Sequence, residues 1–339
     1  MLKYILRRLK DIIPTIFLVT LIVFFITRII PGNPASAMLG PQASAEDIKA
    51  LETQLGLDKP ILVQFADYLK NLAKLDLGTS YRYNVPVFSL IAERFPNTVR
   101  LSIFALLIAL ILGVPMGIWA ALKKGSVIDL LLSSISLLGV SIPVFWLGIM
   151  LALLFSVNLQ LLPSNGMGSL DNGFLSYMSY YILPGITLAT IPMANFARIT
   201  RSSILDVMNN NYIKTARAKG VSNFKIVTKH AFKNAAIPLL TVVGMQLSSL
   251  LSGAVLTETI YSWPGMGRLI VEAIDKRDFI VIQGVVIFTA IIYVLVNLAV
   301  DILYKLVNPK IDIEGEKQWK ILILLKLKNI KKEVPSLYF

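Results

Sequence analysis

The chain has 339 residues, of which 55% are hydrophobic, and it carries a net charge of +13 with no cysteine. This composition is too apolar for a soluble domain, and the lack of cysteine excludes disulfides, thiol chemistry and cysteine-ligated metals. Because His230 is the sole histidine, a histidine-rich metal site is excluded as well, and we expect no metal site in the chain.

Six continuous apolar runs predict six membrane-spanning helices, because only helices and closed barrels satisfy the backbone in lipid and these runs do not alternate. They cover roughly residues 9–30, 98–122, 130–157, 182–202, 236–257 and 280–304. Pro115, Pro143 and Pro192 lie within the runs and predict kinks. The first run is longer than the apolar core of a secretory signal, so we interpret it as an uncleaved span.

The basic residues flank these runs unequally, and the imbalance predicts the orientation. Segments 1–10, 123–124, 198–234 and 305–339 together hold 22 of the 33 lysines and arginines, whereas segment 31–97 holds six basic and seven acidic residues. Positively charged segments stay on the cytoplasmic side of a membrane. Both termini are therefore predicted to be cytoplasmic, and the positive charge needs no nucleic acid as a partner.

The outer segment 31–97 carries the signals of a small helical cap. Ser44 can cap a first helix that stops at Gly56, Pro60 can open a second, and Pro86 can open a third that ends near Pro96. Such a cap could simply cover the ends of the spans, or it could dock an external partner.

The spans carry no charged residue at mid-depth, where an ion-coupled carrier usually has one. Their polar residues at depth are uncharged, and these could either join helices by hydrogen bonds or line a path for a hydrated solute. The candidate pathway-lining residues are Ser141, Asn195, Gln246 and Ser249.

Between the fourth and fifth spans lies a basic, polar insert, residues 209–238. Its pattern predicts a short helix up to Lys219, a turn at Gly220 that needs a positive φ, and a second helix capped by Ser222. In the second helix, Phe224, Val227 and Ala231 are predicted to share one side, and Pro238 is predicted to start or kink the fifth span. This pattern is typical of a docking element, although a merely solvated positive loop would satisfy the charge rule equally well.

Within the insert, Thr215-Ala216-Arg217-Ala218-Lys219-Gly220 is followed by His230-Ala231-Phe232-Lys233-Asn234 and Pro238. This order resembles the cytoplasmic coupling loop of ABC-importer permeases, whose general form is Glu-Ala-Ala, three residues, then Gly. Lys214 and Thr215 replace its first two positions and the proline falls later. Both departures match the dipeptide/oligopeptide/nickel permease branch of that family.

Further blocks carry the same resemblance along residues 1–311. They are Ile30-Pro31-Gly32-Asn33-Pro34, with Asn33 where that branch usually has Asp; Ser141 to Gly148; Arg198 to Ser203; the block GAVLTETIYSWPGMGR from Gly253 to Arg268; Arg277-Asp278; Gln283-Gly284; and Asn308-Pro309-Lys310. The tail 312–339 is outside the resemblance. The ordered set is far more specific than any one motif.

The resemblance implies an all-α fold of the type I ABC-importer permease kind, in the bacterial inner membrane. The domains would be the N-terminus and first span in 1–30, a helical extracytoplasmic segment in 31–97, the ABC transmembrane type-1 domain in 98–304 with its coupling loop at 209–238, and a cytoplasmic tail in 305–339.

The resemblance also implies partners and two sets of site residues. The partners would be a homologous second permease, two ATP-binding-cassette ATPases that bind ATP and Mg²⁺, an extracytoplasmic solute-binding protein and membrane lipid. The chain itself has no phosphate-binding loop, so we expect no cofactor in it and no enzymatic activity. The ATPase-coupling residues would be Tyr212, Thr215, Ala216, Arg217, Ala218, Lys219, Gly220, His230, Asn234 and Pro238. The external gate would be shaped by Glu258, Trp263, Pro264, Gly265, Gly267 and Arg268.

The function expected is half of a pathway for di- and oligopeptides that works by alternating access. Nickel chelates and glutathione-like peptides are alternative substrates of similar permeases. A secondary transporter or channel would need an intramembrane ion site that the spans do not show. A hydrolase built on Ser141 and His230 is disfavoured, because one lies in a span and the other in the cytoplasmic insert. His230 is therefore expected to be a contact residue.

Overall fold

The computed structural model describes residues 2–29, 34–40, 42–54 and 56–307, and in this part of the chain the secondary structure is helical apart from one isolated bridge between Thr79 and Pro86. Five helices are long and apolar enough to cross a membrane, and a bent pair makes a sixth if it counts as one span. The predicted all-α membrane fold is confirmed. Residues 1–300 form one compact unit. Of the second unit, residues 301–339, only the end of the last helix is described, so the motif Asn308-Pro309-Lys310 and the tail lie outside the described residues.

The first span and the outer cap follow the sequence closely. Helix α1 is Leu2–Ile29, α2 is Pro34–Leu39, α3 is Ala45–Gln54 and α4 is Ile61–Ala73. Ser44 caps α3 by accepting a hydrogen bond from the Asp47 amide, and α4 follows Pro60, as predicted. Phe65 of α4 packs on the aromatic rings of Phe24 and Phe25 of α1, with ring centroids 5.1 and 6.1 Å apart. Residues 30–33, which begin the motif after the first span, lie outside the described residues.

The prediction of a separate third helix in the cap, from Pro86 to near Pro96, is wrong. Helix α5, Val87–Leu122, runs through Pro96 without a break and forms both the predicted third helix and the second span. Pro86 does stand at its start, as predicted. The proline at 96 is tolerated because a long helix satisfies the freed carbonyl through its neighbours.

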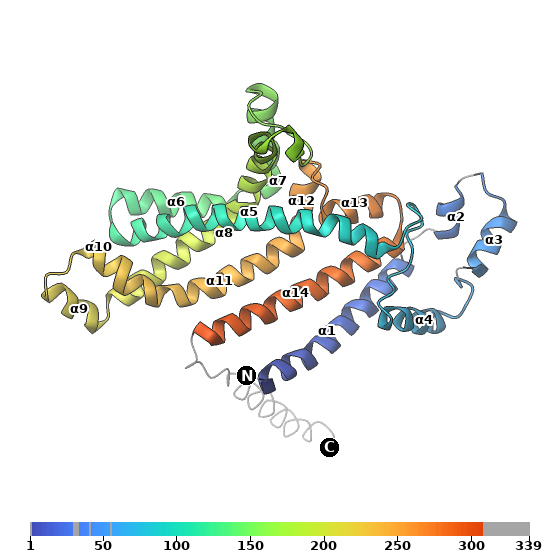
Figure 1. Cartoon of the computed structure of the whole chain (residues 1–339), viewed down its shortest axis with the longest axis horizontal. Coiled ribbons are helices and arrows are strands. Elements are labelled where there is room, and N and C mark those ends of the chain that lie inside the picture. Colours follow the sequence, from blue (N-terminus) through green and yellow to red (C-terminus); the bar gives the residue numbers. More distant parts are fainter. Residues whose placement is uncertain (1, 30–33, 41, 55, 308–339) are drawn as a thin grey trace, which may run out of the picture. The chain divides into compact units, whose positions relative to one another are not determined.

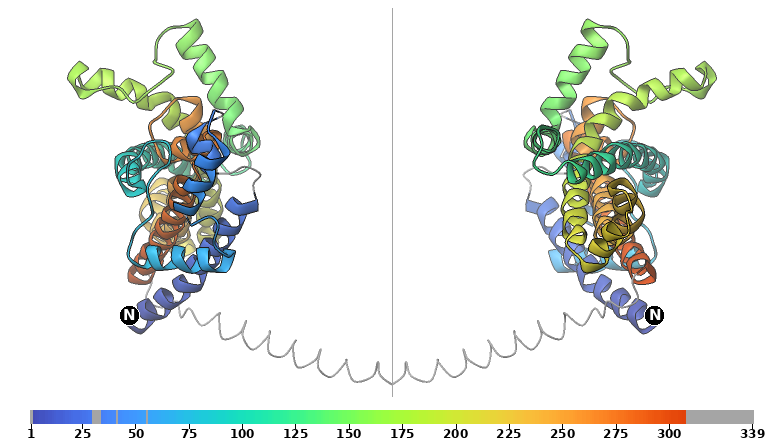
Figure 2. Two further views of the ribbon diagram at one scale, coloured as in Figure 1. Left: turned by 90° about the vertical axis from the view of Figure 1, so that its right-hand side faces the viewer. Right: turned by 90° about the vertical axis from the view of Figure 1, so that its left-hand side faces the viewer.

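The predicted third span is a bent pair of helices in the structure. It consists of α6 (Val127–Ser141), α7 (Val144–Ala152) and the π-helical turn η1 (Leu153–Asn158). A bend of 99° separates α6 from α7 at Ile142–Pro143. Figure 1 shows α6 and α7 running in different directions, and Figure 2 shows the molecule from two further sides. Pro143 cannot donate the amide hydrogen bond that would continue α6. Its predicted kink is therefore confirmed, and the turn is much sharper than a simple kink.

The remaining elements build the core around α5 and α8. They are η2 (Leu170–Asn172), α8 (Phe174–Met208), α9 (Asn211–Ala218), α10 (Asn223–Lys225), η3 (Ile226–Ala231), α11 (Phe232–Gly253), α12 (Val255–Ile260), α13 (Met266–Asp275) and α14 (Phe279–Val307). Helices α5 and α8 form the most extensive contact of the fold. A Cβ on Gly113 or Gly117 of α5 would lie 2.4 Å from a carbonyl oxygen of α8, so these glycines are what allow the two backbones to approach so closely.

Helix α11 separates the two regions in which the predicted site residues gather. Figure 1 shows α9 and α10 near its first residues and α12 and α13 beyond its last residues. The predicted cytoplasmic insert, residues 209–238, and the segment 253–268, which holds the predicted external-gate residues and is called the outer block below, therefore lie at opposite ends of one helix. A displacement of the insert can reach the outer block through this helix and through α8 beside it.

An ion pair ties α6 to α8. Arg201 donates from Nε to Asp129 Oδ1 at 2.6 Å and from Nη2 to Asp129 Oδ2 at 2.8 Å, and Asp129 also accepts from the Gly125 amide. The carboxylate is buried. Helix α8 continues to Met208, beyond the predicted end of its span at 202, so Arg198 and Arg201 lie within the helix rather than at its end.

We expect Asp129→Ala to destabilise the protein by about 2–3 kcal/mol, because it leaves the Arg201 guanidinium without its buried partner. Thermal unfolding of the purified complex measures the loss. Arg201→Lys, with Asp129 intact, should cause a smaller loss of stability, since an ammonium keeps the charge but cannot make the two-pronged contact. Asp206→Ala, at an exposed site on the same helix, is the control and should have little effect. Equal losses for Asp129→Ala and Asp206→Ala would contradict this role of the ion pair.

Candidate functional site

The turn at Gly220 closes the first helix of the insert as predicted. Gly220 has φ +77°, its amide donates to the Arg217 carbonyl at 2.9 Å, and the Val221 amide donates to the Ala216 carbonyl at 3.2 Å. These two bonds are the Schellman pattern, in which a left-handed residue after the helix satisfies its last free carbonyls. Apart from its chain neighbours, no atom of the described residues lies within 4 Å of a Cβ built at Gly220, so the backbone angle is what this position demands.

The insert buries one apolar face against the ends of two spans. Val227, Ala231 and Ala235 are buried and form a cluster with Ala121 of α5 and Ile204 of α8. Apolar packing of this kind moves as a unit, because a close-packed cluster resists small separate displacements. The insert is therefore held on α5 and α8 by packing, in addition to its covalent connection to the end of α8.

The opposite face of the insert is exposed, aromatic and basic. Tyr212 and Phe224 are 44% and 63% exposed, and Asn234 donates to the Tyr212 hydroxyl at 2.6 Å. Thr215, Ala218 and the cations around them are also exposed: Lys214, Arg217, Lys219 and Lys225. The predicted grouping of Phe224 with Val227 is wrong, because a π-helical turn intervenes and Phe224 faces away from the buried side. The backbone of His230 lies in that turn, and its side chain is outside the described residues.

The second helix of the insert has no clear end. Ser222 accepts a bond from the Lys225 amide at 3.4 Å, which is the predicted cap, and the chain then continues through α10 and η3 into α11. Pro238 lies inside α11, so it does not start the fifth span. The first of the two predicted alternatives, a span that starts at Pro238, is therefore wrong, because the proline ring is accommodated within the helix, where neighbouring groups re-satisfy the backbone. The second alternative, a kink at Pro238, stays a prediction.

The outer block is built around one buried carboxylate. Glu258 of α12 is fully buried and accepts from the Thr98 hydroxyl at 2.7 Å, the Gly267 amide at 2.7 Å and the Arg268 amide at 3.2 Å. The two amides lie in the first turn of α13, so Glu258 caps that helix from another element and its charge faces the positive end of the helix dipole. A Cβ on Gly265 would lie 2.3 Å from the carboxylate, which explains a glycine there.

Burial raises the pKa of Glu258 above the ordinary glutamate value, because it penalises the charged form more than the three hydrogen bonds favour it.

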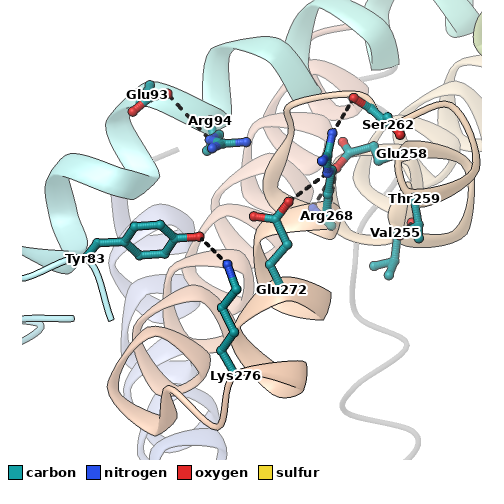
Figure 3. Close-up of polar contacts among 11 residues, drawn as sticks. Tyr83, Glu93, Arg94, Val255, Glu258, Thr259, Ser262, Arg268, Glu272 and Lys276 are labelled. Atoms are coloured by element: carbon teal, nitrogen blue, oxygen red, sulfur yellow. Dashed lines mark hydrogen bonds and ion pairs between the residues drawn. The ribbon is translucent and has the colours of Figure 1, made fainter. Parts of the chain in front are cut away.

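Two further residues fix the outer block to its surroundings. Trp263 is fully buried, donates its indole N–H to the Asn97 carbonyl at 3.1 Å and meets the Tyr181 ring edge-on. Arg268 donates to Glu272 at 2.8 Å and to the Ser262 carbonyl at 2.6 Å, a bridge that is visible in Figure 3. The Pro264 carbonyl accepts a hydrogen bond from the side-chain amide (Nδ2) of Asn97 at 2.9 Å. Glu258 and Trp263 can therefore influence a gate only by holding backbone in place, since neither side chain reaches solvent.

Sequence reasoning gave no contact role to Thr98 or Asp278, although Asp278 stands in one of the blocks that carry the resemblance. Thr98 both donates to Glu258 and accepts from the Met266 amide at 2.8 Å. Asp278 accepts from the Ser80 hydroxyl at 2.6 Å and the Arg82 amide at 3.1 Å, and so ties the outer cap to α14. The partners lie far apart in the chain, and neither a threonine inside α5 nor an aspartate between α13 and α14 carries a signal of a distant contact.

The four candidate pathway residues fall into two groups. Asn195 and Gln246 line one cavity between α8 and α11. Ser141 is exposed at the end of α6 and donates to its own helix, at the Leu137 carbonyl, and Ser249 is exposed on α11 outside that cavity. Only the first pair is brought together.

Comparison with known proteins gives the same architecture. The family described as binding-protein-dependent transport system inner membrane component matches residues 113–313, and the corresponding N-terminal family matches residues 1–102. The MetNI methionine ABC transporter in an inward-facing conformation superposes with a TM-score of 0.53 at 17% identity, covering 65% of this chain and 97% of the matched chain. At that identity the likeness shows the fold alone.

Relatives of higher identity share nearly the whole chain. The dipeptide transport system permease protein DppB of Alkalihalophilus pseudofirmus is 46% identical over 331 residues, with 92% of this chain and 99% of the relative covered. DppB of Escherichia coli is 41% identical over 335 residues, and the glutathione transport system permease protein GsiC of Escherichia coli is 41% identical over 311 residues, both with the same coverage. Together with the helical fold, these matches show that the chain belongs to the family of inner-membrane permease components of binding-protein-dependent ABC importers.

Proposed function

We propose that this chain forms half of the translocation pathway of a peptide importer and is driven by separate ATPase subunits docked on the insert 209–238. The observation that carries the proposal is the two-sided insert. Its apolar face packs on the ends of α5 and α8, while its exposed face presents aromatic and basic side chains to a partner. Such an element can convert a movement of an outside protein into a movement of the spans.

The partners follow from this role. A homologous second permease would complete the pathway, two ATP-binding-cassette ATPases would bind ATP and Mg²⁺, and an extracytoplasmic binding protein would deliver the solute. ATP would close the ATPase pair and open the spans outward, and hydrolysis would restore the inward state. Both termini and the insert would be cytoplasmic, as the distribution of positive charge predicts.

Di- and oligopeptides are the proposed solutes, because relatives named as dipeptide permeases match nearly the whole chain at 41–46% identity. Glutathione is the second candidate, since a glutathione permease matches at 41%. Both are peptides with a free carboxylate. The chemistry required of the pathway is therefore shared.

Purification of the chain with co-expressed products of neighbouring genes tests this proposal. We expect two ATPases and a second permease in the complex, and ATP-dependent dipeptide uptake in proteoliposomes when the binding protein is added. Glutathione uptake under the same conditions separates the two solutes. Uptake driven by an ion gradient, with no ATPase retained in mild detergent, would instead support a secondary transporter.

A further inference from the structure

A cavity of about 440 Å³ lies between α8 and α11. Its polar lining consists of Asn195, Arg198 and Ser202 on α8 and Gln246 on α11, and Val242 and Met245 complete the α11 side. This volume lies within the range of small-molecule sites, which combine an apolar wall with a few placed polar groups. The cavity is therefore of the right size and composition for a small polar solute.

The two arginines in the C-terminal part of α8, Arg198 and Arg201, differ in whether a carboxylate neutralises their charge. Arg201 is paired through two hydrogen bonds with Asp129. Arg198 is exposed, and its only hydrogen bond to a described residue is to Asn195 Oδ1 on its own helix, at 3.2 Å. It has no carboxylate partner in the part of the chain that the structure describes. Arg198 lies near the predicted cytoplasmic end of its span, and an ionisable side chain of a span that no protein carboxylate neutralises is a candidate for binding an anionic ligand.

The other polar groups around the cavity also keep unused hydrogen-bonding capacity. Neither the Ser202 hydroxyl nor the Gln246 amide forms a hydrogen bond with another described residue. A guanidinium has five N–H donors, and Arg198 uses one of them. The site is thus rich in donors and has one uncompensated positive charge, which is complementary to an anion with two oxygens.

We infer that this cavity is a subsite for the free carboxylate of the transported peptide, with Arg198 as its charged partner and Gln246 and Ser202 as hydrogen-bonding neighbours. The inference rests on the proposed function, because it names the group of the solute that the pathway contacts. It goes further by placing recognition in the permease itself, in addition to any selection by the external binding protein.

The position of the subsite suggests how binding is linked to energy input. Helices α8 and α11 are the two spans that the insert connects, and Arg198 lies ten residues, or about 15 Å, before the end of α8. A change in the angle between α8 and α11 would alter both the cavity and the insert. A bound carboxylate and a docked ATPase would then bias the same pair of helices.

The test measures peptide binding to the whole importer in lipid nanodiscs without the binding protein. The probes are the dipeptide glycyl-phenylalanine and its C-terminal amide, followed by saturation-transfer NMR. The wild-type complex should bind the free acid about tenfold or more tightly than the amide, as a charge-assisted pair predicts. Arg198→Gln should abolish this preference and Arg198→Lys should retain part of it.

Arg100→Gln is the matched control, because Arg100 also bonds an asparagine three residues earlier, Asn97, but lies outside the cavity. It should preserve the preference for the free acid. A preference that survives in Arg198→Gln, or is lost equally in Arg100→Gln, overturns the inference. If wild-type proteoliposomes fail to transport any peptide, the proposed function has failed instead.

Two other partners for Arg198 are distinguished in the same experiment. Nanodiscs of phosphatidylcholine and of phosphatidylglycerol separate a peptide carboxylate from a lipid phosphate. A peptide preference that disappears only in phosphatidylglycerol would assign the site to lipid and contradict the inference. Dissociation of the second permease in Arg198→Gln would assign Arg198 to a subunit interface and contradict it equally.

Discussion

Gly220→Val should reduce the solute-stimulated ATPase activity of the assembled importer by about tenfold or more while leaving the chain in the membrane. A β-branched residue at φ +77° is strained by about 1–3 kcal/mol, so the turn after α9 would open or shift. Because no atom lies within 4 Å of the added Cβ, the effect comes from the backbone and not from a clash. The ATPase rate with and without solute, measured in proteoliposomes, gives the result.

Two variants sharpen this experiment. Gly220→Asn should retain most of the coupling, because asparagine tolerates the left-handed region. Gly125→Val introduces the same strain at φ +76°, also with no atom within 4 Å, in the turn between α5 and α6. It should preserve coupling. Normal coupling in Gly220→Val, or an equal loss in Gly125→Val, would contradict the role given to the insert.

Glu258→Ala should destabilise the protein by about 3 kcal/mol or more, since it leaves two buried amides of α13 without an acceptor and removes the partner of Thr98. Thermal unfolding of the purified complex measures the loss. Glu272→Ala is the control in the same block. Among the described residues, the Glu272 carboxylate is bonded to the Arg268 side chain alone and is partly exposed, so this change should lower stability by less than about 1 kcal/mol. Similar losses for the two variants would mean that Glu258 does not hold the outer block together.

The stability that Glu258 contributes should decrease as the pH rises. Because burial raises its pKa above the ordinary value of 4.5, the folded protein binds more protons than the unfolded chain in the window between 4.5 and the raised pKa. The contribution of Glu258 to the free energy of unfolding is fully present below pH 4.5, and it falls as the pH rises through this window. The melting temperature of the wild type should therefore fall with pH relative to Glu258→Gln. A constant difference between the two proteins across the window would contradict the burial effect.

The sequence predicted those elements whose signals are local. Ser44, Pro60 and Gly220 act through their own backbone and neighbouring amides, so a cap or a turn could be recognised without the fold. Continuous apolar runs likewise predicted spans, because burial in lipid depends on length and composition. The ends of the spans were the weak part, since α8 runs past its predicted end at 202 to Met208, and α11 already begins at Phe232, inside the insert.

The contacts between distant segments could not be predicted. The Asp129–Arg201 pair joins residues 72 positions apart, the cap of α13 by Glu258 joins two elements, and Asn195 and Gln246 line one cavity from two different helices. The 99° bend at Pro143 had a local cause, but its size depends on packing against neighbouring helices. The orientation of Phe224 was missed because a π-helical turn changes the period of the helix.

The most direct test of the account is a cross-link from the insert to an ATPase. The chain has no cysteine, so Phe224→Cys introduces a single thiol at an exposed position of the insert. Leu175→Cys, at an 85% exposed position near the start of α8, is the matched control at the far end of that helix from the insert. With a short bismaleimide and an ATPase subunit carrying one exposed cysteine, position 224 should give a permease–ATPase product whose yield changes with ATP. Position 175 should give none. Absence of the product at 224, or equal yields at 224 and 175, would contradict the claim that the insert is where the ATPase drives this permease.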